Sequence, residues 1–103
     1  MEEEPMAENL RSLDTAEIEE RLEQLDGWEY RDGMLRREFV FPNFVEAIGF
    51  LTRAAIHAER LNHHPDWSNL YNTVRVALET HDVGGISHLD FDLAMTMNEL
   101  AST

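Results

Sequence analysis

The sequence predicts an α+β domain in which a four-stranded antiparallel sheet carries three helices on one face. Its 103 residues suit a single compact domain. Two segments have the turns and alternation of β-hairpins, and three segments have caps and apolar residues at helical spacing. The expected order is helix, hairpin, helix, hairpin, helix, and helices covering one sheet face would bury a single core. Residues 1–9 are acidic and aperiodic, so we expect a disordered tail before a single domain at 10–103.

Each expected helix begins at a capping residue. Asp14 with Glu17, Asn43 with Glu46, and Ser87 with Asp90 have the three-residue spacing of a helix start. The first helix continues to a stop at Gly27, and the second must end before Pro65. The apolar residues expected to be buried are, in turn, Ile18, Leu22 and Leu25; Phe44, Ile48, Leu51, Ala55 and Ala58; and Leu89, Leu93, Met97 and Leu100.

The two hairpins are marked by turn residues and by alternation. Asp32-Gly33 suits a tight primed turn between residues 28–31 and 34–41. Arg37 shares a strand face with Leu35 and Phe39 and weakens the alternation there. The second hairpin is expected from Trp67 to Tyr71 and from Thr73 to His81, followed by a loop at 83–85.

The composition excludes several classes of function. The chain has no cysteine, which rules out disulfides, thiolate catalysis and cysteine-based metal sites. No apolar run is long enough to cross a bilayer, and the acidic N-terminus is the reverse of a signal peptide. We therefore expect a soluble, cytoplasmic protein without a membrane partner.

The charge is strongly unbalanced. The chain has 21 acidic residues and 8 basic residues, all of them arginine, which gives a formal net charge of −13. Such a polyanion repels nucleic-acid phosphates, so no nucleic-acid partner is expected. An acidic substrate would also be repelled unless its site is locally neutral or positive. The acidity serves either solubility or adaptation to high salt, where ions screen the self-repulsion.

Four of the five histidines lie between His63 and His88. His63 and His64 fall at a helix exit and His81 at a strand end, positions from which imidazoles can exchange protons with a ligand at neutral pH. Glu59 stands one helical turn before His63, which predicts a hydrogen bond between them. From these residues alone, an acid–base site, a three-histidine metal site and no site at all remain open. His57 and His88 are expected to be ordinary surface residues or hydrogen-bonded polar residues of the core.

A longer pattern then resembles a known family. An acid, three residues, His-His-Pro, five residues, an aromatic, nine residues, His, eight residues and Asp is the signature of the pterin-4a-carbinolamine dehydratases. The sequence meets each term with Glu59, His63-His64-Pro65, Tyr71, His81 and Asp90. The similarity covers about residues 13 to 100. Departures are Asn62, where some members have an acid, and the absence of lysine.

The resemblance implies the same fold, a pterin substrate, no metal or other cofactor, and a homodimer or homotetramer. It also implies that the segments matching His63–Pro65 and Thr80–Val83 hold the pterin. The expected catalytic residues are His63, His64, His81 and Asp90, although helix capping alone would also explain Asp90. The expected substrate-binding residues are Glu59, His63, His64, Pro65, Trp67, Thr80, His81, Asp82 and Val83.

The implied reaction is loss of water from a 4a-hydroxytetrahydropterin, which gives the quinonoid dihydropterin. An imidazolium can protonate the leaving oxygen while a neutral imidazole accepts a ring-nitrogen proton, and each transfer contributes about 10²–10⁴-fold. We expect His63 and His81 to move the protons and His64 to position the pterin. Trp67 and Tyr71 are candidates for an aromatic wall.

Two other functions stay open at this stage. One is a pterin enzyme of another pathway, such as molybdenum-cofactor metabolism. The other is a non-enzymatic interaction or dimerisation module, because some members of the family in animals also stabilise a transcription-factor dimer. A pure adaptor would not need the full set of histidines, which favours an enzyme.

The charge generates the first prediction. If self-repulsion among the acids opposes folding, the melting temperature should rise from low to molar potassium chloride as ions screen it. Thermal unfolding followed by circular dichroism across that series measures the effect. A melting temperature that stays constant or falls would leave solubility as the explanation of the acidity.

Overall fold

The computed structural model describes residues 9–102. Of the predicted tail at 1–9, all but Asn9 lies outside the described residues. No helix of the described part has the length and apolarity needed to cross a membrane.

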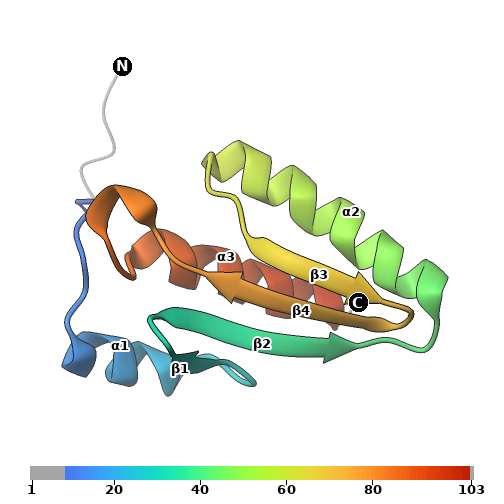
Figure 1. Ribbon diagram of the computed structural model, residues 1–103, viewed down its shortest axis with the longest axis horizontal. Coiled ribbons are helices and arrows are strands. Elements are labelled where there is room, and N and C mark those ends of the chain that lie inside the picture. The colour runs from blue at the N-terminus through green and yellow to red at the C-terminus, as the bar shows by residue number, and fades with distance from the viewer. Residues whose placement is uncertain (1–8, 103) are drawn as a thin grey trace.

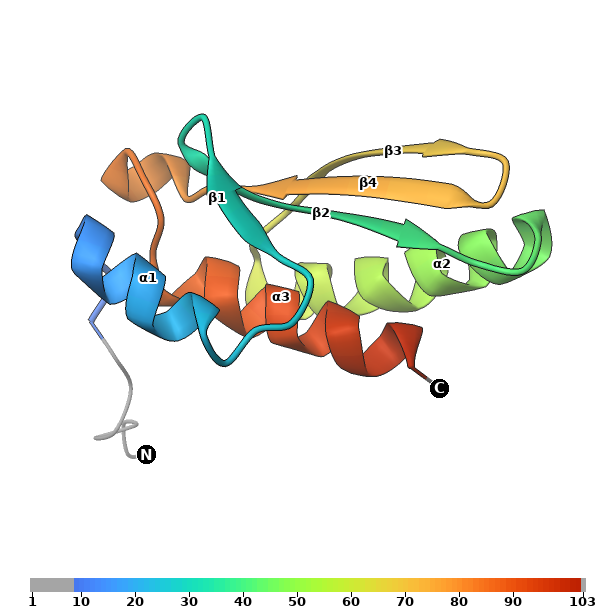
Figure 2. The ribbon, with the colours of Figure 1, turned by 90° about the horizontal axis from the view of Figure 1, so that it is seen from below.

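The fold has two layers, one of helices and one of strands, as Figures 1 and 2 show. The helices α1 (Thr15–Leu22), α2 (Phe44–Leu61) and α3 (His88–Ala101) all lie on one face of the sheet, and the other face is open. The four strands are antiparallel in the order β1-β2-β4-β3, with bounds Glu29–Arg31 for β1, Met34–Val40 for β2, Thr73–Leu78 for β4 and Asp66–Leu70 for β3. The predicted fold class and element order are confirmed.

Local signals placed most element ends correctly. Asp14 and Ser87 form complete capping boxes, and the Asn43 side chain accepts from the Glu46 N–H. Asp32 (φ +54°) and Gly33 (φ +79°) form the predicted primed turn between β1 and β2. The first helix is shorter than predicted, because it ends at Leu22 and irregular turns continue to Gly27.

Arg37 lies on the helix-covered face without disrupting the core. Its guanidinium sits 4.3 Å from the Phe39 ring centroid and donates to Asn98 Oδ1 at 2.7 Å. Asn98 also accepts from the Trp28 indole N–H, at 2.8 Å. Burial of this guanidinium lowers the pKa of Arg37 from its ordinary value. A stacked and hydrogen-bonded arginine therefore takes the place of an apolar residue in the alternation.

The predicted buried stripe of α2 is confirmed at Ala58 and is wrong in phase along the rest of the helix. Its buried residues are Ala47, Phe50, Ala54 and Ala58, whereas Phe44, Ile48 and Ala55 are exposed and Leu51 is half-buried. Three alanines let the helix approach the sheet closely, and one phenylalanine fills the space between them. Burial thus follows close approach rather than side-chain size, and larger apolar side chains remain on the surface.

Candidate active site

The two histidines that follow α2, His63 and His64, lie in different environments. Asn62 caps the helix in the left-handed conformation (φ +52°), so the chain leaves the helix axis and turns toward β3. His63 is 8% exposed, whereas the His64 side chain is 60% exposed. Neighbours in the sequence therefore enter different environments, one buried and one open to solvent.

His63 belongs to a buried polar network centred on Asp90. Its Nε2 lies 2.6 Å from Oδ1 of Asp90, which is fully buried. The other carboxylate oxygen accepts from the Thr80 hydroxyl at 2.7 Å and from the Ser87 N–H at 3.0 Å. Because the Thr80 proton is engaged there, the Ser87 hydroxyl donates to Thr80 Oγ1 across 2.7 Å.

The Asp90 carboxylate makes two contacts, one with the start of α3 and one with a histidine. One oxygen caps α3, and the other receives the His63 imidazole. A carboxylate that accepts on both oxygens leaves Nε2 as the donating nitrogen of His63. Nδ1 is then the only ring nitrogen of His63 that remains for another partner.

The predicted hydrogen bond between Glu59 and His63 is wrong. Glu59 Oε1 instead lies 2.9 Å from His64 Nε2. Helical spacing no longer applies beyond Asn62, where the helix ends in a left-handed turn. This turn brings His64, and not His63, beside Glu59. Glu59 is therefore the carboxylate partner of the exposed histidine.

A small open pocket of about 80 Å³ brings the second and third histidines together at one end of the sheet. His64 comes from the α2 exit, and His81 begins the short 3-10 turn η1 (His81–Val83), three residues beyond the end of β4. The His81 side chain is 88% exposed, and its Nε2 lies 3.6 Å from Glu79 Oε2. The whole lining is Met34, His64, Asp66, Ala77, Glu79 and His81.

A tight turn holds His81 in place. The Thr80 N–H donates to the Gly85 carbonyl at 2.7 Å, and Gly84 (φ +67°) closes the turn with an N–H bond to the His81 carbonyl at 3.0 Å. A side chain at Gly84 would be strained by the positive φ. The Thr80 hydroxyl anchors the same turn to Asp90. Asp90 therefore holds both the buried His63 and the turn that contains the exposed His81.

Other expected binding residues lie around the pocket rather than in its lining. Pro65 and Val83 are half-buried and Asp82 is exposed, while the Thr80 hydroxyl is occupied by the buried network. Trp67 packs against the core and lines a larger hollow nearby. Tyr71 lies at the far end of β3, about 15 Å along the strand from Asp66, so it forms no wall of this pocket.

Four lining residues were missing from the sequence prediction. Asp66 follows Pro65 directly, and Glu79 stands two residues before His81, so both carried a signal in the sequence. Ala77 and Met34 carried none, because only the strand register brings them to this end of the sheet. Within residues 9–102, no three histidine, aspartate or glutamate side chains are grouped to hold a metal ion.

Comparison with known proteins shows which family has this α+β fold and this arrangement of residues. The family model for pterin 4 alpha carbinolamine dehydratase matches residues 11–100. The chain therefore belongs to the pterin-4a-carbinolamine dehydratase family, which confirms the resemblance seen in the sequence.

Individual relatives agree with this assignment. A protein of Chelativorans sp. strain BNC1, provisionally named a pterin-4-alpha-carbinolamine dehydratase, is 53% identical over 94 residues, which are 89% of this chain and 96% of the relative. One from Roseobacter denitrificans with the same provisional name is 56% identical over 77 residues, 73% of this chain and 79% of the relative. A crystal structure of a transcriptional coactivator/pterin dehydratase from Brucella melitensis superposes with a TM-score of 0.87 at 43% identity and covers 88% of this chain and 99% of that one.

The buried network generates the second prediction. Asp90→Ala leaves the His63 imidazole, the Thr80 hydroxyl and the Ser87 N–H without their acceptor, so the free energy of unfolding should fall by about 3–5 kcal/mol. Denaturant unfolding measures this loss. Asp92→Ala, two residues along the same helix and exposed, is the matched control and should cost under about 1 kcal/mol.

A double-mutant cycle with His63→Ala separates the pair from the cap. We expect a coupling between His63 and Asp90 of about 0.5–3 kcal/mol. Additive losses would mean that the carboxylate acts on stability through the cap alone.

Proposed function

We propose that this protein dehydrates a 4a-hydroxytetrahydropterin to the quinonoid dihydropterin by histidine acid–base catalysis, in pterin recycling. The observation that carries the proposal is the pair of exposed imidazoles, His64 and His81, on one pocket. Each has a carboxylate beside it, Glu59 and Glu79 respectively. The family membership supplies the substrate class.

The chemistry balances without any further reactant. The bond between carbon 4a and the hydroxyl oxygen breaks, and a proton from one imidazolium leaves with that oxygen as water. The second imidazole, neutral at the start, takes the proton from a ring nitrogen. A neighbouring carboxylate stabilises whichever imidazole is cationic at the time, so the two histidines can exchange roles between stereoisomers of the alcohol.

The size of the pocket limits how the substrate can lie. Its volume of about 80 Å³ is far below the roughly 300–1,000 Å³ typical of sites that enclose a small molecule. Only the reacting edge of the pterin would enter, while the rest of the ring lies along the open face of the sheet. Pro65, between the lining residues His64 and Asp66, and the segment 80–83 that contains His81 would contact that ring.

The geometry favours a different division of labour from the one expected from sequence. His63 is buried, and its Nε2 is held by Asp90, so we propose that this pair positions the segment that carries His64 and Pro65. His63 is not part of the pocket lining, and Nδ1 is the ring nitrogen that it has left for the substrate. His64, which was expected to position the pterin, becomes a proton-transfer residue together with His81.

Two alternatives keep specific support. A pterin enzyme of another pathway, such as molybdenum-cofactor metabolism, would use the same pocket and reaction type. An interaction module would use the exposed apolar residues of α2, and the Brucella protein is described both as a transcriptional coactivator and as a pterin dehydratase. The paired imidazoles and carboxylates favour the enzyme, because an adaptor has no use for them.

Self-association is part of the proposal. Large apolar side chains stay exposed on α2 and at the β3–β4 turn, among them Val45 (75% exposed), Ile56 and Leu70. Burying such a surface stabilises an assembly by about 25 cal/mol per Å² of apolar area. β3 is also an edge strand with unpaired backbone groups.

The third prediction is therefore a homodimer or homotetramer in solution. Light scattering at high salt, where the repulsion between copies is screened, should give two or four times the chain mass of 11.9 kDa. A mass equal to one chain across the micromolar range would contradict it.

The fourth prediction tests the reaction. His64→Ala and His81→Ala should each lower turnover of chemically generated 4a-hydroxytetrahydrobiopterin by about 10²–10⁴-fold, with little change in the melting temperature. His63→Ala should lower both turnover and stability, because it empties a buried site. His57→Ala on α2 is the control and should change neither. Full turnover in both the His64 and the His81 variants would refute the proposed mechanism.

A further inference from the structure

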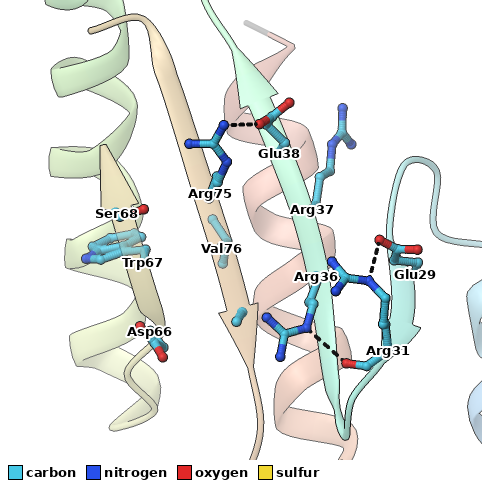
Figure 3. A pocket seen from close by; sticks show the side chains of 11 residues that line it. Glu29, Arg31, Arg36, Arg37, Glu38, Asp66, Trp67, Ser68, Arg75 and Val76 are labelled. Carbon is cyan, nitrogen blue, oxygen red and sulfur yellow. Dashed lines mark hydrogen bonds and ion pairs between the residues drawn. The ribbon is translucent and has the colours of Figure 1, made fainter. Parts of the chain in front are cut away.

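The open face of the sheet holds a second, larger hollow of about 460 Å³ (Figure 3). Its lining is Glu29, Arg31, Arg36, Arg37, Glu38, Asp66, Trp67, Ser68, Arg75, Val76 and Ala77. Asp66 and Ala77 also line the histidine pocket. The two hollows therefore meet, and a ligand that reacts at the histidines can extend into the larger one.

The strand register sets the distances along this groove. Glu29, Arg36, Ala77 and Asp66 form one row across the four strands. Residues two apart on a strand are about 7 Å apart. The Arg36 row therefore lies about 7 Å from Met34 at the histidine end, and Arg75, in the next row, lies about 14 Å away.

Acidic and basic side chains balance in this groove, although the chain as a whole is acidic. Four of the eight arginines belong to the lining, but the Arg37 guanidinium lies on the helix-covered face, so the open face carries Arg31, Arg36 and Arg75. With the three acids of the lining, Glu29, Glu38 and Asp66, these three arginines give the groove a formal charge of 0, against −13 for the whole chain. An anion repelled by most of the surface meets no such barrier in this groove.

Arg36 is the arginine best placed to bind an anion. Arg31 is paired with Glu29 and Asp32, and Arg75 with Glu38 at 2.9 Å. Arg36, in contrast, donates to the Arg31 carbonyl at 2.9 Å and contacts the Met34 sulfur at 3.5 Å. Across residues 9–102 it has no carboxylate partner, and Figure 3 shows it reaching from β2 toward β4 over the groove. Its remaining N–H groups have the planar arrangement that matches phosphate or carboxylate.

We propose that the substrate is a pterin whose side chain carries an anionic group, a phosphate or a carboxylate, and that Arg36 binds this group. The inference rests on the dehydratase function proposed above and names its substrate class. Ala77 keeps the floor of the groove low between the histidines and the arginines, so a side chain of a few atoms spans the gap. The pairs Arg31–Glu29 and Arg75–Glu38 are exposed and individually weak, so their guanidinium groups can turn to a ligand.

Binding of stable pterins tests this without turnover. Quenching of pterin fluorescence should show that 7,8-dihydroneopterin monophosphate binds at least about tenfold more tightly than neutral 7,8-dihydroneopterin. Dihydrofolate, whose side chain ends in carboxylates, is the second anionic probe, and a gain for the phosphate or for the carboxylate compound identifies the anion. Arg36→Gln should remove most of the gain and leave binding of the neutral pterin within about twofold.

Matched variants guard against general effects of charge or folding. Arg53→Gln on α2 removes the same charge from the opposite side of the sheet and should leave the preference intact. Arg75→Gln, further along the groove, should weaken the preference less than Arg36→Gln and supplies the test if the latter does not fold. Arg36→Lys keeps the charge but loses the planar donors, so it should retain only part of the gain.

The outcomes separate this inference from the dehydratase proposal. If the neutral 4a-hydroxytetrahydropterin is turned over but neither anionic pterin binds more tightly than the neutral one, the inference is overturned and the function stands. An equal loss for neutral and anionic pterins in Arg36→Gln also overturns it. If the protein neither binds nor turns over any pterin, the proposed function fails and this inference fails with it.

Discussion

The buried carboxylate of Asp90 is the interaction on which the site depends. It joins three segments that are distant in sequence: the α2 exit through His63, the end of β4 through Thr80, and the start of α3 through Ser87. A charged group in the core is costly unless each lone pair finds a donor, and here both oxygens are engaged. The network therefore works as a unit, and its geometry fixes where the two exposed histidines can stand.

One face of the sheet packs against the helices, and the other face carries the two hollows. β4 lies at the centre, and its alternation sends Val74, Val76 and Leu78 to the helices and Arg75 and Ala77 to the open face. On the open face, small and charged side chains leave a groove that the helices never cover. Because the groove is close to neutral in a chain of −13, an anionic ligand meets less repulsion there than the net charge alone would give.

Features that depend on near neighbours in the sequence could be predicted. The caps at Asp14 and Ser87 and the turn at Asp32-Gly33 are set by a few adjacent residues, and the structure has them as expected. The order of elements then fixed the fold class, because few arrangements bury two hairpins and three amphipathic helices together. The histidines were found for a similar reason, since all three lie at or just beyond the end of an element.

Features that depend on tertiary contacts could not be predicted. The phase of the α2 stripe is set by how closely the helix approaches the sheet, which favours Ala47 over Ile48. Arg37 finds its partner, Asn98, 61 residues away. Met34 and Ala77 reach the pocket through strand register alone. The partner of Glu59 depended on a single left-handed residue, Asn62, whose conformation helical spacing does not reveal.

The left-handed residue Asn62 also explains why the adjacent residues His63 and His64 lie in different environments. Within a helix, neighbours point about 100° apart and would share much of one surface. Beyond Asn62 the helix has ended, and Pro65 disfavours helical geometry at the residue before it, so successive side chains can point to opposite sides. One histidine then enters the Asp90 network while the next faces the pocket. His63, held by Asp90, fixes the backbone next to it, and this backbone positions His64 at the pocket.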